Sequence, residues 1–214
     1  MQNIIVDKKH EAYEPLKAMQ KLCDQYRKRA GKAGAGKGLS YIHYNGEAVR
    51  FEASDGRALL TYYWTPEQLD GVYNALYEFK NGVLVDSGES YYFPEIRRVI
   101  PEIGGDYNSY GEHYENIYEI TPYEFGSTCP ADYRLCTVLG HYDIAIDGKY
   151  SAVVRDILPR FSFLALAVTT NGDISAKERA VFLHGGGMEF VVMPMTPSWN
   201  RIPASVPERL KRGA

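Results

Sequence analysis

The feature that most constrains the fold is a run of strand-like segments separated by turn signals. Segments 39–44, 47–53 and 57–64 are rich in apolar and aromatic residues, and Asn45-Gly46 and Asp55-Gly56 stand between them. Asn-Gly and Asp-Gly favour tight hairpin turns, because the central residues of such turns need positive φ. The sequence therefore predicts an antiparallel sheet built from consecutive hairpins.

A helix is predicted just before this sheet. Residues 14–30 place apolar side chains at helical spacing, and Pro15 suits the first turn of a helix. The glycines from Gly31 to Gly38 end the pattern. Residues 3–8 before the helix form a short predicted strand.

A second helix is predicted after the hairpins. Thr65 can cap its first turn, and an apolar stripe follows at Leu69, Val72, Tyr73, Leu76 and Tyr77. Asn81-Gly82 ends this helix and leads into a further hairpin of segments 83–86 and 90–93.

The same order of elements is predicted again near the C-terminus. Segment 142–146 is a predicted strand, 150–158 a helix and 163–169 a strand, and segments 179–184 and 189–193 pair around three glycines. A strand–helix–three-strand unit therefore occurs twice, in element order rather than in residue identity. We expect an α+β fold with helices packed on antiparallel sheets.

Composition suggests two domains. Residues 101–121 are rich in Gly, Tyr and acids without periodicity, which is typical of a connector. We expect one domain over residues 1–101, an abbreviated second domain over 102–195, and a mobile tail over 196–214.

The cysteines and the apolar runs indicate a cytoplasmic protein without a metal. The 214 residues include 3 Cys at spacings unlike those of metal ligands, and the 5 His are scattered. Free thiols in a reducing cytosol are the simplest interpretation. No apolar run approaches the roughly 20 residues of a membrane span, and the N-terminus lacks a signal-peptide pattern. We expect no metal and no cofactor.

Charge is uneven along the chain. The formal net charge is −3, yet the stretch from Leu16 to Gly38 holds one acid, Asp24, against seven cations: Lys17, Lys21, Arg27, Lys28, Arg29, Lys32 and Lys37. A local basic face can bind a phosphate backbone even on an acidic protein, because salt screens charges beyond about 8–10 Å. The alternative is a solvated helix face with no partner.

A glycine-rich segment offers a competing, enzymatic interpretation. Residues 31–38 come within one position of the phosphate-binding pattern G-x-x-x-x-G-K-[ST], but Gly38 stands where Ser or Thr is needed. The segment also closes a predicted helix, whereas a phosphate-binding loop opens one. No Ser/His/Asp or Cys/His arrangement is suggested by local sequence, so we expect no catalytic site.

Three segments follow recognisable patterns in order along the chain. Residues 53–59 are similar to A-T-D-G-H-R-L, with Ser54 for Thr and Arg57-Ala58 for His-Arg. Residues 93–101 are similar to F-P-x-Y-R-R-V-[IL]-P, with Ile96 for Tyr. Residues 190–195 are similar to V-[VI]-M-P-M-R-L, but Thr196-Pro197 replace Arg-Leu and the chain continues. With these three segments in this order, the chain resembles the bacterial DNA polymerase III sliding clamp (β subunit) family.

This resemblance implies a DNA-clamp-like fold in a shortened, two-domain member. Bacterial clamps carry three domains and close a ring as dimers. This chain has room for two domains, so three head-to-tail copies would supply the six domain equivalents of the family ring. Homo-oligomerisation is therefore implied by the resemblance.

The resemblance also implies a peptide-binding cleft between the middle and last domains. In clamps this cleft takes linear motifs of polymerases and other DNA-handling proteins. Methionines beside a proline give an adaptable apolar surface, and Arg98 could meet a peptide carboxylate or carbonyl. The alternative is that residues 191–195 form only a buried edge strand. The residues that match the cleft are Ser54, Gly56, Arg57, Leu59, Pro94, Arg98, Val99, Val191, Met193, Pro194 and Met195.

In the family ring, helices contact the phosphates of double-stranded DNA without reading bases. The matching candidates are Lys17, Lys21, Arg27, Lys28, Arg29 and, on the predicted helix of residues 150–158, Arg155. The implied function is a non-enzymatic processivity or tethering factor in DNA replication. The alternatives are a monomeric adaptor that binds peptides without encircling DNA, and a nucleotide-binding enzyme that uses residues 31–38.

Overall fold

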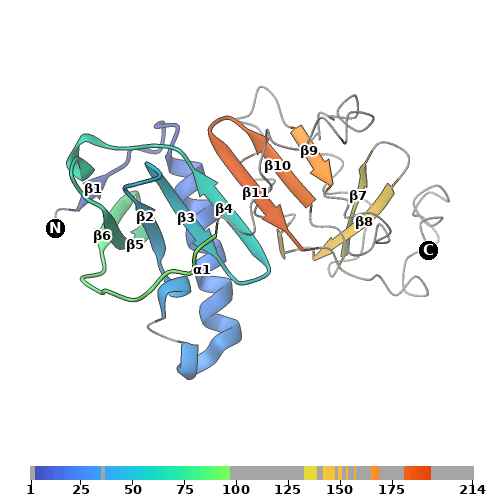
Figure 1. Cartoon of the computed structure of the whole chain (residues 1–214), viewed down its shortest axis with the longest axis horizontal. Helices are drawn as coiled ribbons and strands as arrows, with labels where there is room; N and C mark the ends of the chain where they lie inside the picture. The colour runs from blue at the N-terminus through green and yellow to red at the C-terminus, as the bar shows by residue number, and fades with distance from the viewer. Residues whose placement is uncertain are drawn as a thin grey trace. The chain divides into compact units, whose positions relative to one another are not determined.

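The computed structural model describes residues 3–34, 37–96, 133–138, 142–147, 149–150, 153, 157, 165–168 and 181–193. The chain forms two compact units (Figure 1). The first unit comprises Met1–Ile96 with Gly187–Glu189, and the second comprises Arg97–Gly186 with Phe190–Ala214. The domain boundaries predicted at 101 and 195, and the connector and tail, lie outside the described residues and stay predictions.

The first unit contains an antiparallel sheet, as the hairpin signals predict. Neighbouring strands pair antiparallel throughout this unit's sheet. Their order across the sheet is β1 (Ile4–Ile5), β6 (Val83–Asp86), β5 (Asn74–Lys80), β2 (Ile42–Asn45), β3 (Arg50–Ser54) and β4 (Ala58–Tyr62).

Helix α1 (Tyr13–Gly34) lies against this sheet (Figure 1). Its apolar positions Leu16, Met19 and Leu22 are fully buried. Burial of each such side chain contributes about 1.5–3 kcal/mol, so this contact dominates the unit's core. Gly31 has φ 56° and ψ −152°, so the regular helix ends where the sequence predicts.

The three turn signals behave differently in the structure. At Asn81-Gly82 both residues have positive φ and Lys80 pairs with Val83, which is a true two-residue hairpin. Asn45 pairs instead with Arg50, so a loop of residues 46–49 replaces the predicted two-residue turn. Ser54 pairs with Leu59 in the register of β3 and β4, so the Asp55-Gly56 turn is also wider than predicted.

The predicted helix from Thr65 to Tyr77 is wrong. A single 3₁₀ turn, η2 (Glu67–Leu69), is followed by β5. The apolar residues of that region fit both the period of a helix and the alternating period of a strand. Hydrogen bonding to β2 on one side and β6 on the other stabilises the strand. The predicted strand at 90–93 is also wrong: these residues have no strand structure, and β6 pairs with β5 and β1.

The second unit repeats the predicted order of elements. Strand β7 (Tyr133–Val138) pairs with β8 (Tyr142–Asp147), and β9 (Ala165–Val168) pairs with β10 (Val181–Gly185), beside β11 (Met188–Val192). Between β8 and β9, the described residues Lys149, Tyr150, Val153 and Ile157 are helical. The α+β class and the repeated strand–helix–three-strand order are confirmed. Within the described ranges, no helix is long and apolar enough to cross a membrane.

Gly38, the first residue of the 3₁₀ turn η1 (Gly38–Ser40), allows a close approach between segments. A Cβ at this position would lie 2.2 Å from the carbonyl oxygen of Tyr92. We expect Gly38→Ala to lower the free energy of unfolding by about 3 kcal/mol, because the backbone must shift. Gly88 has φ +66° with open space around it, so Gly88→Ala is the control and should cost about 1 kcal/mol. Urea denaturation checks both values, and equal losses would contradict the steric explanation.

Tyr77 is fully buried, and its hydroxyl has no hydrogen-bond partner in the described structure. We expect Tyr77→Phe to raise the free energy of unfolding by about 1 kcal/mol, because an unpaired buried hydroxyl is destabilising. The control Tyr44→Phe removes a hydroxyl that bonds Thr65 Oγ1 and should not stabilise.

The same variant should change the alkaline stability of the protein. Burial, with a smaller effect of Asp86, raises the pKa of Tyr77 to about 12, whereas an unfolded tyrosine has a pKa of about 10. The wild type therefore loses stability as the pH rises from about 10 to 12, where only the unfolded chain ionises readily. Urea midpoints across this range should fall less steeply for Tyr77→Phe, and parallel curves would contradict this assignment.

Candidate functional site

The turn between β3 and β4 carries four of the predicted cleft residues. Ser54 Oγ donates to the carbonyl oxygen of Ala58 at 2.9 Å and accepts from the amide of Gly56 at 3.0 Å. Gly56 and Arg57 are exposed, Ser54 is half-buried and Leu59 is buried. The turn therefore presents Gly56 and Arg57 at the surface, while Leu59 anchors it in the core.

Asp55 holds this turn together, and the sequence prediction missed it. Its Oδ1 accepts hydrogen bonds from the amides of Arg57 and Ala58, both at 2.9 Å. Its Oδ2 lies 3.2 Å from Nη1 of Arg29 on α1. The Asp-Gly pair signals such a turn from sequence alone, but the Arg29 partner arises only from the fold.

The other predicted cleft residues are described only in part. Pro94 is exposed, and its neighbour Phe93 is buried and stacks on His43 with ring centroids 4.7 Å apart. In the second unit Val191 is buried and Met193 is 49% exposed. Arg98, Val99, Pro194 and Met195 lie outside the described residues, so the cleft itself stays a prediction.

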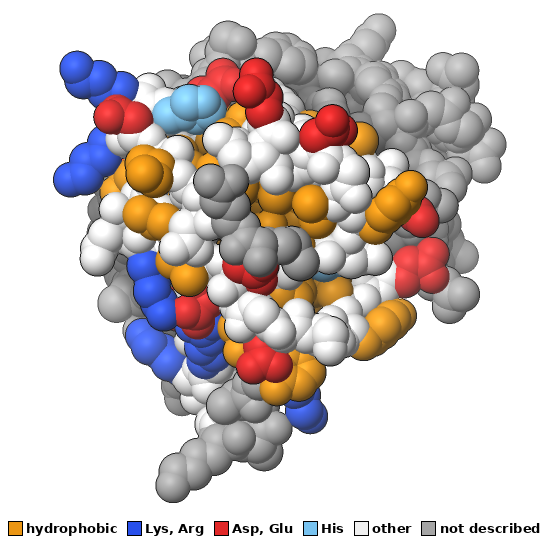
Figure 2. Space-filling view, turned by 90° about the vertical axis from the view of Figure 1, so that its left-hand side faces the viewer, with side chains coloured by type: hydrophobic (Ala, Val, Ile, Leu, Met, Phe, Trp, Pro, Cys, Tyr) orange, Lys and Arg blue, Asp and Glu red, His pale blue; other side chains and the backbone are white. Residues whose placement is uncertain are grey.

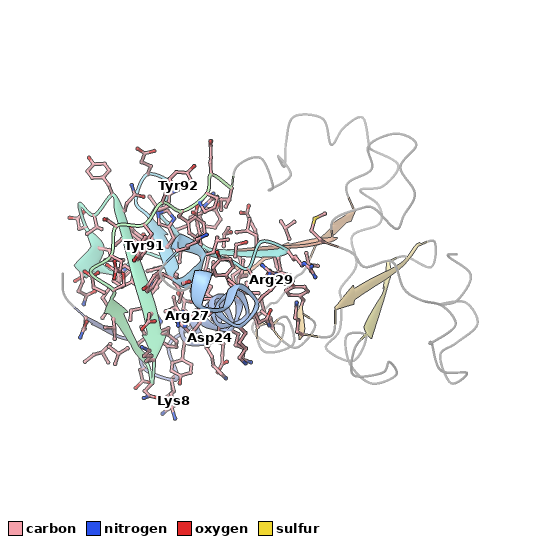
Figure 3. All side chains as sticks on the ribbon, turned by 90° about the horizontal axis from the view of Figure 1, so that it is seen from below. Lys8, Asp24, Arg27, Arg29, Tyr91 and Tyr92 are labelled. Carbon is pink, nitrogen blue, oxygen red and sulfur yellow. The ribbon has the colours of Figure 1, made fainter. Side chains whose placement is uncertain are left out.

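Acidic partners reduce the basic character of α1. Lys17 pairs with Glu14 at 3.0 Å. Arg27 pairs with Asp24 at 3.3 Å and also with Glu78 of β5. Figure 3 shows Asp24 and Arg27 on this helix. The sequence places only Asp24 among these cations, and the fold adds an acid from the sheet.

The remaining candidates for DNA contact differ in exposure. Lys28 is exposed, and none of the described residues forms an ion pair with it. Lys21 is half-buried, and Arg155 lies outside the described residues. On the face in Figure 2, Lys and Arg side chains gather along one side, while Asp and Glu side chains are scattered. The basic surface is therefore local.

An aromatic stack adjoins Arg27, and the sequence prediction did not include it. The guanidinium carbon of Arg27 lies 5.4 Å from the ring centroid of Tyr41, which stacks on Tyr91 at 6.1 Å. Tyr92 is 80% exposed. Figure 3 shows Tyr91 and Tyr92 on the segment that follows β6. Burial is the main cause that raises the pKa of Tyr41, and the nearby carboxylates of Glu89 and Glu78 raise it further. These acids lie near Tyr41, as Arg27 does, so this surface is not strongly cationic.

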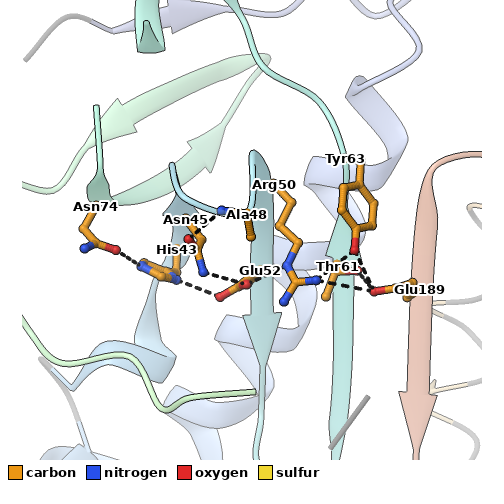
Figure 4. A network of polar contacts seen from close by, with 9 residues as sticks. All are labelled: His43, Asn45, Ala48, Arg50, Glu52, Thr61, Tyr63, Asn74 and Glu189. Atoms are coloured by element: carbon orange, nitrogen blue, oxygen red, sulfur yellow. Dashed lines mark hydrogen bonds and ion pairs between the residues drawn. The ribbon is translucent and has the colours of Figure 1, made fainter. Parts of the chain in front are cut away.

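A polar network with a buried centre lies on one side of the first unit's sheet (Figure 4). At its centre, Glu52 accepts from Arg50 Nε at 2.8 Å and lies 2.9 Å from His43 Nδ1. His43 Nε2 lies 2.9 Å from Asn74 Oδ1. Burial raises the pKa of Glu52, but the hydrogen bonds from His43 and Arg50 outweigh it and hold the pKa below its usual range.

The same network fastens a distant segment to the sheet. Thr61 Oγ1 donates to Glu189 Oε2 at 2.9 Å, and Arg50 donates to the hydroxyl of Tyr63 at 2.8 Å (Figure 4). The amide of Tyr63 also donates to the carbonyl oxygen of Gly187 at 2.8 Å. Residues Gly187–Glu189 thereby belong to the first unit, although residues 97–186 separate them from Ile96 in the sequence.

Two observations bear on the glycine-rich segment and on metal binding. Gly38, where a phosphate-binding loop would carry Ser or Thr, has no room for a Cβ beside Tyr92. Among the described side chains, no group of three His, Cys, Asp or Glu residues could hold a metal ion.

Comparison with known proteins gives structural matches only. No protein-family model and no curated protein sequence matches this chain. The solved structures that match include the β sliding clamp of C. crescentus, at 12% identity and a TM-score of 0.44 over 92% of this chain and 66% of that chain. The DnaN sliding clamp of Bartonella birtlesii, solved with griselimycin, matches at 12% identity and a TM-score of 0.43, over 85% and 65%.

A third match is the DNA polymerase III β subunit of Thermotoga maritima, at 14% identity and a TM-score of 0.43 over 96% of this chain and 68% of that chain. The chain spans slightly less than two thirds of the first two clamps. These are the proteins that the sequence motifs resemble.

Glu52 allows the network to be tested. We expect Glu52→Gln to lower the free energy of unfolding at pH 7 by about 3 kcal/mol, because it removes the closer of the two carboxylates that face buried Arg50. Since the pKa of Glu52 is depressed in the fold, its contribution is present above the usual value of about 4.3 and is lost as the pH falls below it. Urea titrations at pH 7 and pH 4 should show a smaller difference between variant and wild type at pH 4. The exposed Glu67→Gln is the control, and an equal effect there would contradict the role of the network.

Proposed function

We propose that this protein is a non-enzymatic, sliding-clamp-like tethering factor in DNA replication. The observation that carries the proposal is the ordered match of residues 53–59, 93–101 and 190–195 to the clamp motifs. The repeated strand–helix–three-strand order supports it, because a clamp-like chain is built from such repeats. Cytoplasmic location belongs to the same proposal.

The proposed peptide site combines Gly56 and Arg57 on the β3–β4 turn with the segments at Pro94 and Met193. Exposed Met193 supports this role, since a flexible thioether adapts to different apolar side chains. Burial of two or three peptide side chains contributes about 3–9 kcal/mol before the cost of association is subtracted, so peptide binding would be weak and reversible. Such affinity suits exchange between partner proteins.

The proposed DNA contacts lie on α1, with exposed Lys28 as the principal candidate. These contacts would go to the phosphates of double-stranded DNA, so binding would be independent of sequence and sensitive to salt. Three head-to-tail copies would close a ring of six domain equivalents. Ring closure, rather than strong charge attraction, would then retain the protein on DNA.

The second candidate is a monomeric adaptor that binds peptides without encircling DNA. The pairing of Lys17 with Glu14, and of Arg27 with Asp24 and Glu78, favours it. These ion pairs leave fewer cations for phosphates than the sequence suggests.

The decisive experiment measures oligomeric state and DNA retention together. Light scattering over a range of concentrations should show a trimer, and nicked circular DNA should retain the protein longer than linear DNA of the same length. A monomer at high concentration that binds peptides but shows no retention would establish the adaptor instead. Binding of neither DNA nor peptide would reject both candidates.

Met193 tests the peptide site with griselimycin, the molecule bound to the Bartonella birtlesii clamp, as the probe. We expect Met193→Ala to weaken griselimycin binding about tenfold in calorimetry, because it removes an exposed apolar contact. Tyr73, 71% exposed and outside the predicted site, provides the control Tyr73→Ala. Equal affinities of Met193→Ala and wild type would remove Met193 from the site.

A further inference from the structure

Arg29 lies on α1, the helix proposed to contact DNA, but its hydrogen bonds go to Asp55 in the β3–β4 turn of the proposed peptide site. Its Nη1 lies 3.2 Å from Asp55 Oδ2, and its Nη2 donates to the main-chain carbonyl oxygen of Asp55. We propose that Arg29 is a positioning residue that fixes the β3–β4 turn for peptide binding and does not contact DNA. This inference rests on the proposed function and reassigns one of its predicted DNA contacts.

The burial of Asp55 holds Arg29 in place. The Asp55 side chain is 1% exposed, whereas that of Arg29 is 39% exposed. If Arg29 turned toward a phosphate, the buried carboxylate of Asp55 would lose this cationic partner, which is strongly unfavourable. A solvent-exposed contact between Arg29 and a phosphate would contribute much less free energy than the loss of the buried pair would cost. The guanidinium therefore stays with Asp55 when DNA is near.

The contacts of Arg29 also determine the shape of the turn. Asp55 uses Oδ2 for Arg29, which leaves Oδ1 aimed at the amides of Arg57 and Ala58. A Cβ on Gly56 would lie 3.4 Å from Arg29 Nη2, so the guanidinium sits directly against the turn. Arg29 thereby orients the carboxylate that presents Arg57 at the surface.

Arginine suits this position better than lysine. Two nitrogens of one planar guanidinium reach the carboxylate and the main-chain carbonyl of the same residue, and a lysine ammonium on a flexible stem cannot hold this forked arrangement. Lys28, the preceding residue, is exposed and provides a matched cation without this contact.

The test compares Arg29→Ala, Arg29→Lys and Lys28→Ala in the full-length chain. Amide hydrogen exchange at Arg57 and Ala58 reports the turn, and calorimetry with griselimycin, the probe chosen for the proposed peptide site, measures ligand binding. Binding to a random double-stranded DNA at several salt concentrations reports phosphate contacts. Exchange at Leu60, inside β4, provides an internal reference for global stability.

For Arg29→Ala we expect at least tenfold faster exchange at Arg57 and Ala58 relative to Leu60, and at least tenfold weaker griselimycin binding. The salt slope of DNA binding should equal that of the wild type. Lys28→Ala should leave exchange and griselimycin binding unchanged and reduce the salt slope by about one. Arg29→Lys should behave like Arg29→Ala in exchange, although it keeps the charge.

Unchanged exchange with a reduced salt slope in Arg29→Ala would overturn the inference and make Arg29 a DNA contact. If Arg29→Ala does not fold, Arg29→Lys and Asp55→Asn provide the same comparison, and protected Arg57 and Ala58 amides in both would overturn it. If the wild type binds neither griselimycin nor DNA, the proposed function fails, while amide exchange still decides the role of Arg29 in the turn.

Discussion

The burial of one apolar face of α1 against the sheet is the contact on which the rest of the first unit depends. Leu16, Met19 and Leu22 are removed from water against a sheet whose own inner residues include Phe51 and Tyr77. The hydrophobic contribution of these side chains fixes the helix over β3 and its neighbours. Because the helix is fixed, its polar residues reach defined partners on the sheet. Those partners determine which of the helix's charged side chains stay available to bind another molecule.

Two charged contacts illustrate this dependence. Arg27 and Arg29 lie on one basic segment of the sequence, yet the fold gives Arg27 a partner on β5 and Arg29 a partner on the β3–β4 turn. A cation that is already paired with a partly or wholly buried acid is a poor phosphate ligand, because a new contact must replace an existing one. The number of cations in a helix therefore overestimates its attraction for DNA, and exposed Lys28 is the better guide to any such contact.

Local sequence patterns predicted much of the fold. They failed where the spacing of apolar residues fits both a helix and a strand. The helix over 14–30 and the Asn81-Gly82 turn needed only short-range information, namely apolar spacing and positive φ. The segment before Tyr77 fits a helical stripe and also an alternating strand, and its pairing with β2 and β6 settled the choice. Of the candidate site, the sequence indicated Ser54, Gly56 and Arg57 through the turn motif. It could not indicate Arg29 as their support, because that contact joins residues 26 positions apart.

The sequence by itself determined the α+β class, the repeated order of strand, helix and three strands, and the clamp-like motifs in their order. These depend on periodicity and on residue identity at short range. Only the tertiary structure decided which charges are already paired, that Gly38 must lack a side chain beside Tyr92, and that Glu189 joins the first unit through Thr61. Each of these depends on which distant segments the burial of apolar surface brings into contact, and no local pattern encodes that.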